Sequence, residues 1–260
     1  MLIVPALCSG LSFGFAALLV SRFVRRGRPH YALWCLALIW FGVSTAMQFL
    51  GAAFGWSELA YRWWYLTGGI GAAAYLGMGS AFLHRGRAFG WLLVGALLLG
   101  ALLAQSPAGV IALAVFATVL IARPTGWPHA LLALLLAGTV LVALRTLTAP
   151  VDNALLPLPS DQATGQAFDP SVRAITPLFN LPGAVALLAG ALVSVRARSH
   201  VVSNLLIAIG ALVPSLASGL ARFGLTSTFY VAQLVGLLCI LGGFLMRDRT
   251  RARPTPDPSA

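Results

Sequence analysis

The residues best suited to bind a ligand lie in the stretch ELAYRWWYLTGG, residues 58–69. Glu58 and Arg62 are four residues apart, so on a helix they share one face and can form an ion pair. Trp64 and Tyr65 follow at the start of a long apolar run. Aromatic side chains of this kind are enriched where membrane helices meet water. The stretch therefore has two interpretations, an interfacial aromatic belt and the wall of a binding pocket.

Two further charged residues would lie in the same layer as this stretch, on the outer side of a membrane. The candidate pocket comprises Glu58, Arg62, Trp64, Tyr65, Asp152 and Arg222. It would lie under the polar segment 148–177 and would suit an apolar ligand with an anionic end, because arginine binds anionic groups well. The belt explains the aromatic residues without any ligand, so both interpretations stay open.

A second candidate site is a helix interrupted by proline. Pro214 falls near the middle of the apolar segment 201–221, and it leaves the carbonyl of Gly210 without its usual helical donor. Neighbouring groups must then satisfy the freed carbonyl. The predicted cavity beside this kink involves Gly210, Pro214, Ser218 and Gln233. Polar side chains within spans can instead simply hydrogen-bond between helices.

Small residues recur every four positions in the third apolar segment, at Gly69, Ala73, Gly77 and Ala81. On a helix they form one smooth stripe, along which a second backbone can approach closely. We expect this stripe to pack within the bundle, with a homodimer interface as the alternative. A phosphate-binding loop is excluded, because these glycines lie inside an apolar span.

Catalytic and metal-binding chemistry finds little support. No charged residue lies in the middle of an apolar segment, which argues against a proton-coupled transporter. The four histidines, His30, His84, His129 and His200, each stand at a predicted inner membrane boundary. They could share a metal or haem only if they converge, and spacing cannot show that; otherwise they belong to basic loops. We expect no catalytic residue, no metal and no cofactor.

The elements that must position these residues are membrane helices. The chain is 59% hydrophobic and 9% charged, whereas soluble domains carry about 25% charged residues. Crossing a hydrocarbon core takes about 20 apolar residues. The fold class is all-α, a polytopic transmembrane helix bundle with nine predicted spans. They are residues 2–21, 31–53, 63–83, 89–104, 108–122, 130–147, 178–195, 201–221 and 228–246. The fourth and fifth are short and close together, so seven spans is the fallback.

The arginines predict the orientation of the bundle. With the N-terminus outside and the C-terminus in the cytoplasm, the inner segments hold most of the 17 basic residues, as cytoplasmic loops usually do. The outer segments then balance Arg62, Arg145, Arg173 and Arg222 with four acidic residues. Topology therefore accounts for the net charge of +11, and we expect no nucleic-acid partner. The basic inner face would instead meet anionic lipid.

We expect one membrane domain over residues 1–247, with an outer loop at 148–177, followed by a disordered, basic and Pro-rich cytoplasmic tail at 248–260. Within the loop, Asp169 should cap a short helix that has Pro170 at its first position. The next helix is expected to begin at Asn180, with Pro182 in its first turn.

Three stretches carry a resemblance to a known family: YRWWYLTGGIGAAAYLGMGSAFL, LTAPVD and NLLIAIGALVPSLASGLARFG. They resemble segments of a family of bacterial multi-pass membrane proteins. The resemblance covers about half of the chain, and the segment 89–122 departs from it by adding an extra hairpin. It implies about seven spans, an outside N-terminus and a bacterial membrane, and it implies no catalytic residue.

Two classes of function follow, and a third is weaker. The first is a receptor-like, ligand-binding or partner-binding subunit of the bacterial plasma membrane, without catalytic activity, which could bind a second membrane protein or a second copy. The alternative is a carrier or channel for a small neutral or apolar solute, with the Pro214 region as its moving part. An intramembrane enzyme would require the histidines or outer acids to converge.

Overall fold

The computed structural model describes residues 3–123, 125–159, 161–196, 201–221 and 229–252. These residues are mainly helical, and an isolated bridge between Val151 and Phe168 is the only β pairing among them. The helices are α1 (Ile3–Arg26), α2 (Pro29–Phe54), α3 (Glu58–Trp64), the π-helix η1 (Tyr65–Gly71), α4 (Ala72–Leu83), α5 (Arg87–Ala104), α6 (Pro107–Ala122), α7 (Trp127–Thr148), the 3-10 helix η2 (Asn153–Leu155), α8 (Pro170–Arg173), α9 (Thr176–Arg196), α10 (Val201–Ala221) and α11 (Phe229–Ala252).

Each of the nine predicted segments contains a helix, but not all of these helices have the length of a span. Within the described residues, seven helices are long and apolar enough to cross a membrane. The third of them, Glu58–Leu83, joins α3, η1 and α4 without a break. Helix α6 (Pro107–Ala122) and the apolar part of α10 (Val201–Pro214) are shorter. The count of nine spans is therefore not confirmed among the described residues; their seven span-length helices include α5, which the seven-span fallback leaves out, and do not include α6 or α10.

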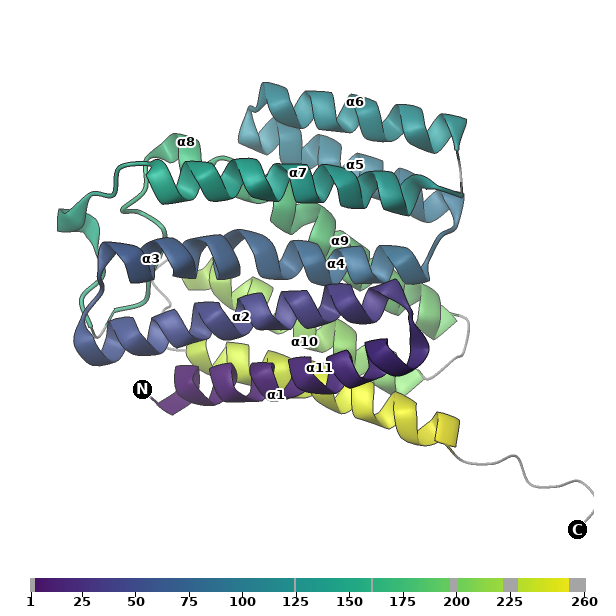
Figure 1. The fold of residues 1–260 in the computed structure, drawn as a ribbon, viewed down its shortest axis with the longest axis horizontal. Coiled ribbons are helices and arrows are strands. Elements are labelled where there is room, and N and C mark those ends of the chain that lie inside the picture. The colour runs from purple at the N-terminus through teal and green to yellow at the C-terminus, as the bar shows by residue number, and fades with distance from the viewer. Residues whose placement is uncertain (1–2, 124, 160, 197–200, 222–228, 253–260) are drawn as a thin grey trace, which may run out of the picture.

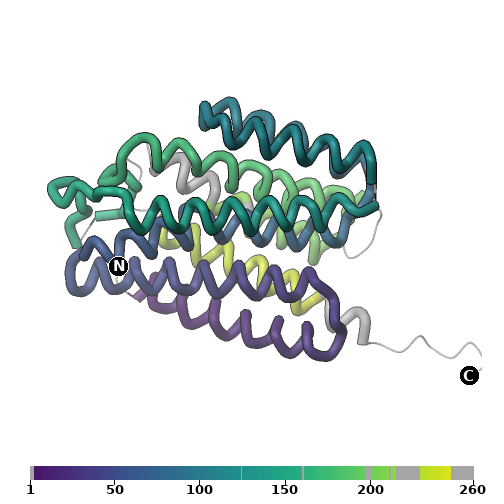
Figure 2. The backbone as a smooth tube through the Cα atoms, turned by 45° about the horizontal axis from the view of Figure 1, so that its top comes forward, coloured from purple at the N-terminus to yellow at the C-terminus, as the bar shows by residue number. Residues whose placement is uncertain are grey.

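The long helices run along one common axis and alternate in direction (Figures 1 and 2). At the centre, α4 packs against both α2 and α9, and α9 also contacts α5 and α10. The pair α1 and α2, the pair α10 and α11, and the hairpin α5–α6 surround this centre. The helix Glu58–Leu83 is thus the innermost: 72% of the residues in its most apolar 18-residue stretch are buried.

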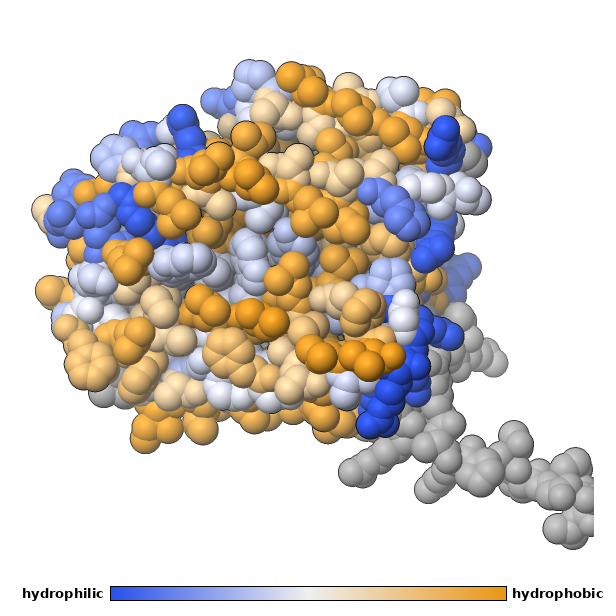
Figure 3. Space-filling view, in the orientation of Figure 1, coloured by the Kyte–Doolittle hydropathy of each residue, from blue (hydrophilic) through white to orange (hydrophobic). Residues whose placement is uncertain are grey.

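Charge separates along the axis of the bundle. Seven arginines in the described part of the chain lie at or near the helix ends that face the C-terminus of α11, namely Arg25, Arg26, Arg28, Arg85, Arg87, Arg123 and Arg196. Of the described acidic residues, Glu58, Asp152, Asp161 and Asp169 belong to the opposite end, whereas Asp248 lies in the last turns of α11 at the arginine-rich end. On the face seen in Figure 3, hydrophobic side chains cover the middle and hydrophilic ones gather towards the two ends. This is the surface expected of a helix bundle that lies in a bilayer.

Glycines allow the central helix to approach its neighbours closely. A Cβ atom on Gly77 would lie 2.4 Å from the carbonyl oxygen of Gly183 in α9, and one on Gly183 would lie 2.4 Å from the carbonyl oxygen of Ala73. On another face, a Cβ on Gly71 would overlap the ring of Trp40 in α2. The small-residue stripe therefore lies against α9 inside the bundle.

The segment between α7 and α9 agrees with the sequence in one detail and corrects another. Asp169 caps α8 as predicted, since its carboxylate accepts the backbone N–H of Ser171 at 2.8 Å and Pro170 is the first helical residue. The next helix begins at Thr176 rather than at Asn180, and Pro182 lies inside it. A second proline, Pro177, occupies the first turn of α9, where its missing N–H costs nothing.

The last helix continues beyond the expected domain boundary at residue 247. It ends at Ala252, and residues 253–260 of the predicted tail lie outside the described residues. Arginines are frequent in its last turns, where positive charge complements the helix dipole.

We predict that Gly77→Val lowers the stability of the bundle, because the added methyl groups must push α4 away from α9. Overpacking of this kind costs about 1–3 kcal/mol. The thermal unfolding midpoint in mild detergent is the measurement. Gly95→Val in α5 is the matched control, since a Cβ there meets no atom within 4 Å. Equal midpoints for the two variants would contradict the close contact.

Candidate ligand-binding site

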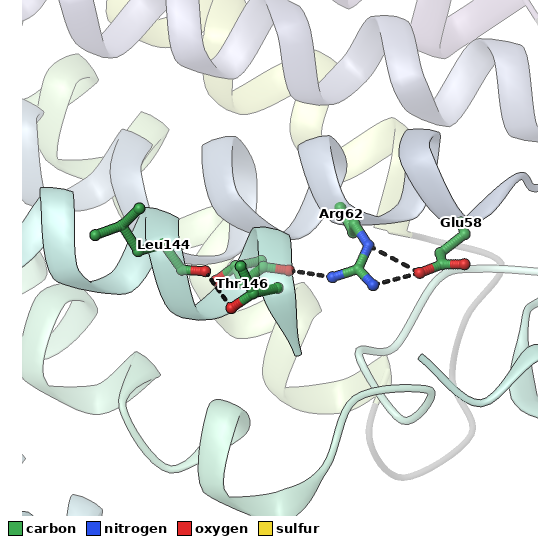
Figure 4. A network of polar contacts seen from close by, with 5 residues as sticks. Glu58, Arg62, Leu144 and Thr146 are labelled. Carbon is green, nitrogen blue, oxygen red and sulfur yellow. Dashed lines mark hydrogen bonds and ion pairs between the residues drawn. The ribbon is translucent and has the colours of Figure 1, made fainter. Parts of the chain in front are cut away.

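Arg62 uses its donors inside the protein (Figure 4). Its Nε donates to Oε1 of Glu58 at 3.1 Å, and its Nη2 bonds the same oxygen, so the expected ion pair is formed. Its Nη1 donates to the backbone carbonyl oxygen of Thr146 in α7 at 2.6 Å. The Arg62 side chain is 11% exposed, whereas that of Glu58 is 46% exposed. Arg62 therefore connects the start of the central helix to the end of α7.

Trp64 and Tyr65 belong to a buried aromatic cluster with Trp56, Tyr61 and Phe168. Neighbouring ring centroids in this cluster are 4.9 to 6.0 Å apart, and the rings are tilted or perpendicular. Such pairs contribute about 0.5–1.5 kcal/mol each beyond the area they bury. The cluster fills the layer in which the sequence predicted a pocket.

The segment after α7 is fastened to this cluster. The Tyr61 hydroxyl accepts the backbone N–H of Ala167 at 3.1 Å, and the N–H of Asp152 donates to the carbonyl oxygen of Ala167 at 2.9 Å. Gly165 has a φ of +81°, and a side chain there would meet the ring of Tyr65 at 2.8 Å. This turn therefore requires glycine for both conformation and space.

The six residues of the predicted outer pocket do not surround a single described cavity. Glu58 and Arg62 pair, and Trp64 and Tyr65 lie in the aromatic cluster. Asp152 is exposed and caps η2 by accepting the N–H of Ala154 at 2.9 Å. Arg222 lies outside the described residues. Ligand binding by this set stays a prediction.

At the predicted kink, the proline packs against the neighbouring helix. A Cβ on Gly236 of α11 would lie 2.4 Å from Cγ of Pro214 and 2.6 Å from the carbonyl oxygen of Gly210. Gln233, one turn earlier in α11, is buried. The side chain of Ser218 is not among those described. A cavity beside this kink stays a prediction.

Each described histidine lies against an aromatic ring. The ring of His30 lies 4.3 Å from that of Tyr31, His84 lies 5.4 Å from Phe89, and His129 lies 5.1 Å from Phe82. His200 is outside the described residues. Among the residues the structure does describe, no three His, Cys, Asp or Glu side chains are grouped so as to hold a metal.

A cavity of about 520 Å³ lies elsewhere, between α4, α5, α6, α7 and α9, and is partly open to the surface. This volume is in the range of small-molecule sites. Its wall is almost entirely aliphatic and includes Gly77 and Ala81 of the small-residue stripe. Further lining residues include Leu97 of α5, Ala112 of α6, Leu134 of α7 and Pro182 of α9.

Helix α7, which forms one wall of the cavity, is held mainly at its two ends. Its buried residues are Trp127 and Pro128 in the first turn, and Val142 and Thr146 in the last two turns. Trp127 donates from Nε1 to the carbonyl oxygen of Arg85 at 3.1 Å. Between the ends, the Tyr75 hydroxyl donates to Oγ1 of Thr139 at 3.0 Å. In the most apolar 18-residue stretch of α7, only 11% of the residues are buried. The middle of α7 therefore borders the cavity and the outside of the bundle.

The polar side chains that line the cavity are those of Arg145 and Ser106, at one end of its wall. Arg145 is exposed, and its Nη2 donates to the hydroxyl oxygen of Ser171 at 3.4 Å. Hydrogen bonds from the Ser171 hydroxyl and N–H lower the pKa of the exposed Asp169 carboxyl, and the nearby Arg145 and Arg173 charges lower this pKa further. Ser106 is the N-cap of α6 and accepts the N–H of Gly109 at 3.4 Å.

The cavity is not predictable from the sequence. The cavity wall is built from leucines, alanines and glycines, which any membrane helix contains. Arg145 was noted only as one of four outer arginines that balance acidic residues. The signal that was present is its place inside the predicted span 130–147, with no acidic residue three or four positions away.

The fold defines a multi-pass helical membrane protein, with seven helices of span length among the described residues. Comparison with protein-family models, curated proteins and solved structures found no match for this chain. The seven span-length helices agree with the multi-pass organisation that the sequence resemblance implies. No family model matched the chain.

We predict that Arg62→Lys lowers the thermal unfolding midpoint of the detergent-solubilised protein. A single ammonium group cannot reproduce the fork that reaches both Glu58 and the Thr146 carbonyl. The loss should be about 1.5 kcal/mol, which is typical of a hydrogen bond made by a charged group. The exposed Arg87 provides the control, as Arg87→Lys. A midpoint for Arg62→Lys equal to that of the control would show that the link to α7 adds no stability.

Proposed function

We propose that this protein is a non-catalytic, ligand-binding membrane protein that holds an apolar molecule in the cavity between α4, α5, α6, α7 and α9. The observation that carries the proposal is the cavity of about 520 Å³ with an aliphatic wall. In a bilayer, the molecules that reach such a wall are lipids and other apolar compounds. An empty apolar space of this size would also forfeit the packing contacts of its lining.

The proposal includes an orientation and a location. The N-terminus lies outside and the C-terminus in the cytoplasm of a bacterial plasma membrane, with up to nine spans when α6 and α10 are counted. The separation of charge along the bundle supports this orientation, because the arginine-rich end suits the cytoplasmic face. That end would contact anionic lipid. Association with a second membrane protein or with a second copy also stays a proposal.

The alternative function is a carrier for a small neutral or apolar solute. The observation that favours it is the attachment of α7, whose buried residues lie in its first turn and in its last two turns. A wall held in this way can move at its middle while its ends stay in place. Solute flux into vesicles that contain the purified protein would favour the carrier, whereas retention without flux would favour the binding protein.

We predict that Ala112→Trp displaces the bound molecule, because Ala112 lines the cavity from α6 and an indole would occupy the space. The protein is purified in mild detergent, and retained small molecules are identified and quantified by native mass spectrometry. Wild type should retain an apolar molecule, and the variant should retain at least about tenfold less, equivalent to 1.4 kcal/mol.

The matched control is Ala114→Trp, two residues further along α6, exposed and not among the residues that line the cavity. It should retain the molecule as wild type does. Equal retention by both variants, or none by wild type, would contradict the proposal.

A further inference from the structure

We propose that the ligand is an anionic amphiphile whose carboxylate or phosphate group binds at Arg145 while its apolar chain lies along α7. This inference rests on the proposed function of the cavity and specifies the chemistry of its ligand. It transfers to Arg145 the anion-binding role that the sequence had suggested for Arg62.

The two arginines differ in the use of their donors. Arg62 is buried and forms an ion pair with Glu58, so its positive charge is already neutralised and does not attract a ligand anion. Arg145 is exposed at the cavity wall and forms no ion pair with a described carboxylate; the exposed Asp169 carboxyl is near enough for the Arg145 charge to lower its pKa but does not line the cavity. Its contact with the Ser171 hydroxyl is long, at 3.4 Å, and the partner is neutral. Arg145 thus keeps most of its five N–H donors for an anionic group.

The same end of the cavity contains the start of α6. Ser106, Ala108 and Gly109 all line the cavity there. Helix α6 has 16 residues, so its N-terminus carries the positive end of a helix dipole. The oxygen of Ser106 accepts the N–H of Gly109, which leaves its hydroxyl hydrogen to donate to a ligand oxygen. Two helices therefore place positive charge at this end of the cavity.

The rest of the cavity has the length and the apolar wall that an acyl chain requires. Its α7 wall runs from Arg145 to Leu131, which is about 21 Å at 1.5 Å per residue. One leaflet of a hydrocarbon core of about 30 Å is about 15 Å deep. No Asp or Glu is among the lining residues. The cavity can thus accommodate an acyl-length chain, with cationic character at one end and no anionic group along it.

The test measures binding of two probes to the purified full-length protein in mild detergent: oleic acid as its anion, and oleyl alcohol, which has the same chain without the charge. Arg145→Gln should weaken oleate binding about five- to tenfold and leave oleyl alcohol binding unchanged. Arg173→Gln removes the same charge at the same end from a residue that does not line the cavity, so it should change oleate binding less than about twofold.

Ala112→Trp separates this inference from the proposed function. If both probes bind wild type, Ala112→Trp blocks both, and Arg145→Gln affects them equally or not at all, the cavity stands and the anionic specificity is overturned. If neither probe binds wild type, the proposed function fails as well. A lysophosphatidylglycerol probe then identifies the source of the anion: stronger binding than oleate indicates a lipid headgroup, and weaker binding indicates a free carboxylate. In both cases Arg145→Gln should weaken the stronger binder.

Discussion

The contact between the backbones of α4 and α9 is the constraint on which the other helices depend. Gly77 and Gly183 meet so closely that neither position has room for a Cβ atom. Lipid tails are as apolar as leucine, so helices in a membrane gain little from burying apolar area and associate through close packing instead. A pair of glycines supplies that packing at the centre. Since α9 also contacts α5 and α10, and α4 also contacts α2, the position of this pair fixes the others.

The same contact explains why a cavity persists beside it. Gly77 and Gly183, where α4 and α9 approach most closely, have no side chains and both line the cavity. The two ends of α7 are held apart from α4 and α9, by the bond from Trp127 to the carbonyl oxygen of Arg85 at one end and by the Arg62–Thr146 bond at the other. The space is thus a consequence of how three helices are spaced, and no single residue creates it.

Much of the fold followed from composition and periodicity, since lipid allows few arrangements of backbone. Helices at all nine apolar segments, the Asp169 cap and the Glu58–Arg62 pair were predictable because each depends on local spacing. The start of α9 was misplaced by four residues because two prolines, Pro177 and Pro182, offer similar signals. The cavity was not predictable, because it depends on which faces of five helices meet, and the sequence of each helix is apolar on every side.

The roles of Arg62 and Arg145 show where local reasoning ends. Both arginines lie near the same end of the bundle, and the sequence favoured Arg62 because aromatic residues surround it. Those aromatic residues form a core that buries Arg62, and burial of a charge requires a partner. Glu58, four residues earlier, is that partner. The aromatic residues that made Arg62 a candidate therefore also bury it, and its charge is neutralised by Glu58. Arg145 has no acidic residue one turn away and projects from the least buried long helix. The proposed anionic ligand would place its charged head beside this exposed arginine and its apolar chain in the cavity.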